Sequence, residues 1–281
     1  MKHWQRTVTT MLILLLLVPA AARAQTRELV DVGGYRLSVL RQGTGNPVVV
    51  FEAGLGDSLD TWLPILPAIA ERTSVLAYSR AGLGGSDSGP ADRSANQEVT
   101  ELHELLTRLG VRPPIVLVCR SYGSILSRLY VSRYPSAVAG LVIVEGTHEQ
   151  QVKRWGMIDS TYPAAFRVFF DSVLRTMPPG AAAGETRETM RIQALGSVPG
   201  MKPLPDIPIA VLTSMKSDPA APYINGTPAG HEVWRELHDE WFHRSGNGIH
   251  VETTRSGHDM QHDEPQLVID AIRFVLDRVK Q

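Results

Sequence analysis

Hydrophobic positions along the chain alternate between short apolar runs and segments with helical spacing. Runs of β-branched and aliphatic residues predict buried strands, and apolar residues three or four positions apart predict helices. The predicted strands are Glu28–Val32 and Tyr35–Gln42, which form a hairpin around Gly33-Gly34, and then Val48–Ala53, Ser74–Tyr78, Ile115–Val118, Val138–Val144, Ile209–Thr213 and Gly248–Thr254. The predicted helices are Asp60–Glu71, Asn96–Leu109, a helix from Tyr122 onward, His231–Arg244 and Pro265–Lys280. This alternation predicts an α/β fold with a mostly parallel central sheet flanked by helices.

Residues 148–205 interrupt the alternation. They carry aromatic and methionine side chains at helical spacing, namely Trp155, Met157, Tyr162, Phe166, Phe169, Phe170 and Met177. Such positions are also typical of an ordinary core. An insertion of this length between two late strands, however, favours a helical lid over the strand ends. Within it, the tract PPGAAAGE at Pro178–Glu185 is predicted to be a flexible joint.

The N-terminus has the pattern of a secretory signal peptide. Lys2 and Arg6 precede the apolar run Met11–Val18, and Ala22-Arg23-Ala24 has small residues at the cleavage positions. We therefore expect residues 1–24 to be removed after Ala24, which leaves a domain of residues 25–281 that is secreted or periplasmic. A retained membrane anchor is the weaker interpretation, because the apolar run is too short to span a bilayer comfortably.

Charge and cysteine content exclude some classes of protein. Removing residues 1–24 takes away three basic residues and no acid, so the net charge changes from −1 to −4. The mature chain also has no basic run, which argues against nucleic acid as a partner. Its single cysteine, Cys119, cannot form an internal disulfide. The sequence does not indicate an oligomeric state.

Ser121 lies where a strand pattern changes directly into a helix pattern. The surrounding sequence, CRSYG, places Cys119 and Gly123 on either side of it. A serine on such a tight turn is raised above the carboxyl edge of the sheet and faces the positive end of the helix, as a nucleophile requires. A helix N-cap is the alternative role for a serine at this position.

Three further loops support the nucleophile interpretation. They are EAGLGD at Glu52–Asp57, SRAGLGGSD at Ser79–Asp87 and SGHDMQHDEP at Ser256–Pro265, each after a predicted strand. Together with the serine turn, these segments resemble the α/β-hydrolase superfamily, in particular its lidded, single-domain, esterase-like members. The chain departs from the usual motifs at positions 52, 79 and 119, which hold Glu, Ser and Cys, and at Ser124, where a second glycine is common.

The resemblance implies a catalytic triad. Ser121 is then the nucleophile and His258 the base, since His258 alone of the histidines follows the last strand in a glycine-flanked loop. Histidines on predicted helices, such as His231 and His238, are expected at the surface. Two acids remain possible: Glu145, directly after a buried strand, and Asp218, after the next strand. We favour Glu145, because a carboxylate at a buried strand end is harder to explain as surface charge.

The same resemblance implies that backbone N–H groups of Leu55 and Tyr122 form the oxyanion hole. The expected activity is cleavage of a small-molecule carboxylic ester by a serine hydrolase, with no cofactor and no metal. His258 and His262 have a spacing that metal sites use, but no third ligand is evident. The alternatives are the same triad acting on an amide, a lactone or a carbon–carbon bond, perhydrolysis, and a non-catalytic ligand-binding protein of this fold.

Overall fold

The structure is a computed structural model, and it describes residues 27–217, 223–242 and 246–279. The predicted signal peptide and Asp218, the alternative acid, lie outside these residues. Among the helices of the described part, none has both the length and the apolar character needed to cross a bilayer.

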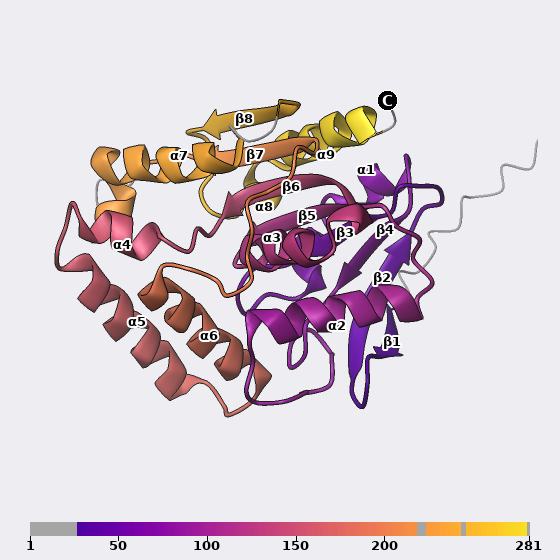
Figure 1. Cartoon of the computed structure of the whole chain (residues 1–281), viewed down its shortest axis with the longest axis horizontal. Helices are drawn as coiled ribbons and strands as arrows, with labels where there is room; N and C mark the ends of the chain where they lie inside the picture. The colour runs from indigo at the N-terminus through magenta and orange to yellow at the C-terminus, as the bar shows by residue number, and fades with distance from the viewer. Residues whose placement is uncertain (1–26, 218–222, 243–245, 280–281) are drawn as a thin grey trace, which may run out of the picture.

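One sheet of eight strands runs through the described part of the chain (Figure 1). The strands are β1 (Arg27–Asp31), β2 (Arg36–Gln42), β3 (Val49–Glu52), β4 (Val75–Tyr78), β5 (Ile115–Ser121), β6 (Val138–Gly146), β7 (Ile209–Ser214) and β8 (Gly248–Thr253). Their order in space is β1-β2-β4-β3-β5-β6-β7-β8. Only the two pairs formed by β2, with β1 and with β4, are antiparallel. The sheet therefore confirms the predicted α/β fold with a mostly parallel sheet.

Helices cover both faces of the sheet, as the buried strands require. Side chains alternate between two hydrophobic clusters, with Leu117 in one and Val116 and Val118 in the other. The first cluster includes residues of α2 (Ala95–Arg108) and α3 (Gly123–Arg133), and the second includes residues of α1 (Leu66–Ala70) and α9 (Pro265–Val279). The remaining elements outside the insertion are α7 (Pro228–Phe242), α8 (Met260–Asp263) and the short 3-10 turns η1 (Leu59–Trp62), η2 (Pro135–Ala137) and η3 (Ile224–Gly226).

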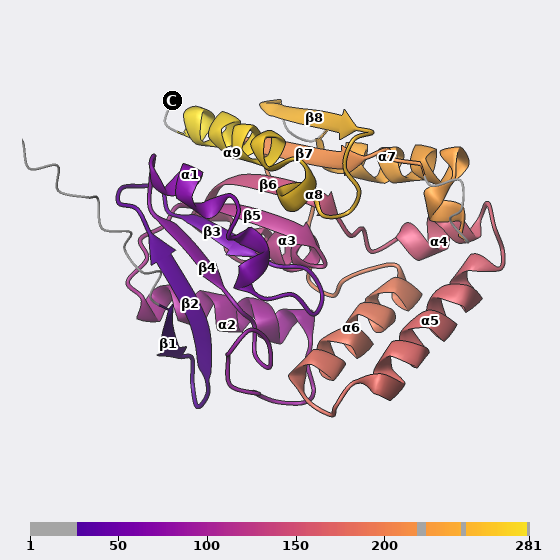
Figure 2. The ribbon, with the colours of Figure 1, turned by 180° about the vertical axis from the view of Figure 1, so that it is seen from behind.

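The insertion between β6 and β7 forms three helices, α4 (Gln151–Gly156), α5 (Tyr162–Thr176) and α6 (Ala181–Leu195). Figures 1 and 2 show α5 and α6 side by side beyond the sheet. A separate hydrophobic cluster joins α4 and the start of α5 to α7 through Trp155, Tyr162 and Trp234. Buried positions differ between the two long helices: α5 buries only Tyr162, whereas nine residues of α6 are buried. A lid movement of this insertion stays a prediction.

Two local predictions differ from the structure. The helix predicted at Asp60–Glu71 is split into η1 and α1, because Pro64 and Pro67 lack the amide hydrogen that a continuous helix needs. The tract Pro178–Glu185 is not a flexible joint throughout, since α6 begins at Ala181. Its alanines favour helix, and a Cβ at Gly184 would lie 2.1 Å from the Ala91 carbonyl oxygen, so small residues allow α6 to pack closely there.

Candidate active site

Ser121 is the last residue of β5, and a single residue, Tyr122, separates it from the start of α3. Its φ of 49° lies in the left-handed region, which is costly for a residue with a Cβ. Gly123 makes the turn sterically possible, because a Cβ there would lie 2.6 Å from the carbonyl oxygens of Glu52 and Ala53. The structure thus shows the strained strand-to-helix turn that the sequence predicts around Ser121.

Glu145 lies at the same end of the neighbouring strand β6, one residue before Gly146, which is the register partner of Ser121. The φ of Glu145 is 47°, and in the described part of the chain Ser121 and Glu145 are the two non-glycine residues with positive φ. Its side chain is buried, with 7% of the residue exposed. Ser214 N donates to Oε2 over 2.6 Å, and Trp234 Nε1 donates to Oε1 over 2.8 Å. Burial raises the pKa of Glu145 to about 7, and these two donors oppose that rise.

His258 lies in the loop between β8 and α8. The loop is held by its own neighbours and by β7: Ser256 Oγ donates to Glu264 over 2.8 Å, Gly257 N donates to Asp263 over 3.2 Å, and Ser214 Oγ donates to Ser256 O over 2.7 Å. His258 is an exposed residue that lines a cavity. Desolvation by the surrounding protein lowers the pKa of His258 to about 4, with the nearby Arg120 charge acting in the same direction. The imidazole is therefore neutral at pH 7, as a general base must be.

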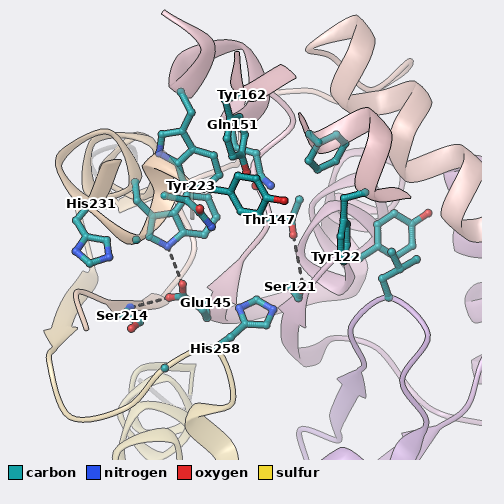
Figure 3. Close-up of a pocket in the computed structure, with 18 of the residues that line it drawn as sticks. Ser121, Tyr122, Glu145, Thr147, Gln151, Tyr162, Ser214, Tyr223, His231 and His258 are labelled. Carbon is teal, nitrogen blue, oxygen red and sulfur yellow. Dashed lines mark hydrogen bonds between the residues drawn. The ribbon is translucent and has the colours of Figure 1, made fainter. Parts of the chain in front are cut away.

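A cavity of about 580 Å³ brings the predicted residues together. Ser121, Tyr122, Glu145, His258 and Leu55 all line it. In the view of Figure 3, the His258 imidazole lies between the side chains of Ser121 and Glu145. Aromatic residues from the insertion, α7 and the segment before it line the rest, namely Trp155, Tyr162, Phe166, Phe169, Phe170, Tyr223 and Trp234.

The loop that carries Leu55 is fixed by a buried ion pair with the insertion. Arg80 donates from Nε and Nη2 to the Glu185 carboxylate of α6 over 2.5 and 2.9 Å, and Nη2 also donates to Gly54 O over 2.6 Å. Gly56 N donates to the same carboxylate over 3.1 Å. The peptides on both sides of Leu55 are thereby oriented by Arg80 and Glu185.

Glu52, one of the positions that depart from the usual motifs, belongs to the same buried network. Its carboxylate accepts a hydrogen bond from Arg80 Nη1 over 2.6 Å and another from the Tyr78 hydroxyl. Burial raises the pKa of Glu52, and the Arg80 charge opposes that rise. Glu52 therefore supports the loop rather than facing the cavity.

Several residues at the site were not found by sequence reasoning. Thr147 Oγ1 lies 3.4 Å from Ser121 Oγ, and Trp234 reaches Glu145 from α7. The expectation that His231 and His238 are at the surface is wrong. His231 lines the cavity, and His238 is fully buried with Nε2 2.8 Å from Gly146 O. Both are buried because α7 packs between the sheet and the insertion, which a helical pattern alone does not reveal.

Among the residues that the structure describes, no group of three or more His, Cys, Asp or Glu side chains is placed to hold a metal ion. Cys119 is buried in the sheet, and its Sγ donates to Val142 O over 3.4 Å, so its side chain is directed away from the cavity.

The fold and this cavity define an α/β hydrolase. The sequence model of the family described as "alpha/beta hydrolase fold" matches residues 47–193, slightly more than half of the chain, and the protein belongs to this family. Its relatives include the uncharacterized protein YqjL of Bacillus subtilis (strain 168). The two are 26% identical over 232 residues, which cover 83% of this chain and 84% of YqjL.

Solved structures share the fold at lower sequence identity. A thermophilic esterase from Thermogutta terrifontis superposes with a TM-score of 0.65 at 18% identity, covering 91% of this chain and 100% of the esterase. An epoxide hydrolase from Bacillus megaterium gives a TM-score of 0.68 at 15% identity, covering 89% of this chain and 100% of the other. At these identities, the similarity concerns the fold alone.

Proposed function

We propose that the protein is an exported serine hydrolase that cleaves carboxylic esters through an acyl-enzyme on Ser121. The observation that carries this proposal is that Ser121, His258 and Glu145 line one cavity. Two of the three, Ser121 and Glu145, have the left-handed backbone conformation at the ends of adjacent strands. Backbone strain persists where the surroundings enforce it, and it concentrates at functional sites.

In the proposed mechanism, Ser121 Oγ attacks the ester carbonyl while neutral His258 accepts the hydroxyl proton. Glu145 orients the imidazole and stabilises the imidazolium. The N–H groups of Leu55 and Tyr122 bind the oxyanion, and each such donor is worth about 3–4 kcal/mol. His258 then protonates the leaving alcohol. Water attacks the acyl-enzyme with the same base, which releases the acid and restores Ser121.

The cavity supports an ester with a modest apolar acyl or alcohol group as substrate. Its aromatic walls come largely from α4, α5 and α7, and Ser121, Thr147 and Glu145 contribute polar groups to the same cavity. Each methylene buried against such walls contributes about 0.8 kcal/mol. Short aliphatic acyl chains of several carbons should therefore react better than acetate.

Export rests on the N-terminal pattern of charge, apolar run and small residues. Protein purified from the periplasm or culture medium of an expressing bacterium should begin at Gln25, as read by N-terminal sequencing. A chain that keeps residues 1–24 would contradict this part of the proposal.

The activity is tested by turnover of p-nitrophenyl butyrate and by labelling with a fluorophosphonate. We expect wild-type protein to show both, with the label on Ser121 by peptide mass. Ser121→Ala should lower kcat by about 10⁴-fold or more and abolish labelling. Ser132→Ala, at the half-buried C-terminal end of α3 and outside the cavity lining, is the matched control and should retain both. Ester turnover that survives in Ser121→Ala would overturn the proposal.

The acid is identified by comparing Glu145→Gln with Asp218→Asn. We expect Glu145→Gln to lower kcat by about 10⁴-fold, because the imidazole then loses its orienting carboxylate. Asp218→Asn should stay close to wild type. The reverse result would assign the acid to Asp218.

A further inference from the structure

Arg120, the residue directly before Ser121, makes contacts that no other residue of the turn makes. Only 6% of it is exposed, although it lies at the end of a strand next to a cavity. Its two terminal nitrogens form ion pairs with Asp57 and Asp259, and Nε donates to His258 O over 3.3 Å. All three guanidinium nitrogens of Arg120 therefore have a hydrogen-bond acceptor.

These contacts join two loops that the proposed mechanism needs to β5, the strand that carries Ser121. Asp57 closes the loop that contains Leu55, and its own N–H donates to Gly54 O over 3.2 Å. Asp259 is the neighbour of His258. The His258 loop is also bonded to Asp263 and Glu264 in the segment that follows it, and to β7, since Ser214 Oγ donates to Ser256 O over 2.7 Å. Arg120 adds a direct link from that loop to the nucleophile strand.

We propose that Arg120 is a positioning residue that fixes the His258 loop and the Leu55 loop at their positions relative to Ser121. The proposal rests on the function assigned above, because that function makes His258 the base and Leu55 an oxyanion donor. Arginine suits this role because its planar fork donates in several fixed directions at once. A lysine ammonium carries the same charge on one nitrogen, and it cannot reach three acceptors that lie around a guanidinium.

Charge gives Arg120 a second, measurable effect on His258. The Arg120 guanidinium lowers the pKa of His258, and the Asp259 carboxylate raises it. Glu145 and Lys216 are charged residues that line the same cavity, and Asp57 pairs with Arg120. Removing the Arg120 charge should therefore raise the pKa of His258, and removing the Asp259 charge should lower it.

The test combines an NMR titration of the His258 ring with kinetics on p-nitrophenyl butyrate. The variants are Arg120→Met, Arg120→Lys and Asp259→Asn, each checked by circular dichroism for folding. Arg255→Met is the control, because Arg255 belongs to the same loop and pairs with Glu264 but is largely exposed. If Arg120→Met does not fold, Arg120→Lys and Asp259→Asn carry the test.

We expect Arg120→Lys to lower kcat about 10- to 100-fold with little change in KM, because small displacements of reacting groups are that costly. Its charge is kept, so the pKa of His258 should stay near the wild-type value. Arg120→Met should raise that pKa, Asp259→Asn should lower it, and Arg255→Met should change neither kcat nor the pKa. A kcat within twofold of wild type in Arg120→Lys would overturn the positioning role, whatever the pKa shifts.

Failure of the ester hydrolase proposal gives a different result. If wild-type protein hydrolyses no ester, the His258 ring signals of Arg120→Lys decide the inference. Broadened or multiple ring signals support a loop that Arg120 holds in place. A single sharp set at the wild-type shifts overturns the inference.

Discussion

Trp234 and Ser214 each donate a hydrogen bond to the buried Glu145 carboxylate. The indole N–H favours the ionised form of Glu145, so it lowers a pKa that burial raises. An ionised Glu145 is the form that the proposed triad requires. The pH at which activity appears should therefore depend on Trp234.

Trp234→Phe should move the rising limb of the kcat/KM profile to higher pH, because it removes one donor to the Glu145 carboxylate. The limb belongs to the coupled Glu145 and His258 pair rather than to one group. Trp155→Phe is the matched control, since the Trp155 indole donates to Gly230 O over 2.8 Å instead. An unshifted limb in Trp234→Phe would contradict this role of the indole.

Glu145→Gln should also change how stability depends on pH. The folded protein raises the pKa of Glu145 from 4.5 to about 7, so ionisation between these values destabilises the wild-type fold. At about 1.4 kcal/mol per pKa unit, the total is about 3 kcal/mol. Between pH 4.5 and 8, urea unfolding should show the variant gaining stability relative to wild type by up to this amount.

Glu149→Gln provides the opposite case for comparison. The Arg128 charge beside Glu149 helps to lower its pKa to about 2, so its stabilising effect is complete above pH 4.5 and is lost below it. The difference in stability between Glu149→Gln and wild type should therefore stay constant from pH 4.5 to 8. A slope for Glu149→Gln as steep as that for Glu145→Gln would contradict the assignment.

The sequence predicted the positions of Ser121, His258 and Glu145 because each lies at, or a few residues after, the carboxyl end of a strand. Carboxyl ends of parallel strands meet at one edge of a sheet, so the order of elements along the chain already places these residues near each other. Arg120 could not be assigned a role in this way. Its ionic partners are 63 and 139 residues away, and no spacing rule connects an arginine to carboxylates on two separate loops.

The two long helices of the insertion differ in how they are attached. α6 is fixed by Glu185, which pairs with Arg80, and by Glu188, which accepts a hydrogen bond from Ala95 N over 3.0 Å. α5 has exposed apolar side chains, including Val168 at 61% and Phe169 at 51%. We infer that α5 is the part of the insertion that opens at low free energy.

Glu185→Gln should lower both activity and stability. It removes the charge that faces buried Arg80, and breaking such a pair costs about 3–5 kcal/mol. It also weakens the acceptor for Gly56 N, so kcat should fall about 10-fold as the Leu55 loop shifts. Urea unfolding and p-nitrophenyl butyrate kinetics measure the two effects.

Glu188→Gln separates those effects, because Glu188 anchors the same helix but does not touch the Leu55 loop. We expect it to lose stability and to keep the kcat of the folded enzyme. Equal losses of kcat in Glu185→Gln and Glu188→Gln would contradict a specific effect of Glu185 on the Leu55 loop. They would mean that both residues act only by stabilising α6.

The molecule as a whole is stabilised by two hydrophobic layers, one on each face of the sheet, without a disulfide. Its one thiol, Cys119, lies in the central strand β5, and burial raises the pKa of Cys119 to about 12. A thiol reagent should therefore react with Cys119 only when the sheet opens. The rate of labelling in increasing urea should follow global unfolding measured by circular dichroism, and a reductant should leave the melting temperature unchanged.

Rapid labelling of Cys119 in native buffer would contradict this view of the sheet as one cooperative unit. Such a result would show that β5 separates from its neighbours while the rest of the sheet stays folded. Cys119→Ser is the reagent control, since it has no thiol to label.

In the proposed triad, the nucleophile and the acid lie on adjacent strands, with Ser121 opposite Gly146 in the register of β5 and β6. The spacing of the two backbones is therefore set by the sheet, at about 4.8 Å. The helix α5 contributes cavity residues but contains neither Glu185 nor Trp234, so its sequence can change during evolution without realigning the reacting groups. With Glu145 as the proposed acid, the loop after β7 supplies none of the reacting groups, and its sequence can vary with the substrate.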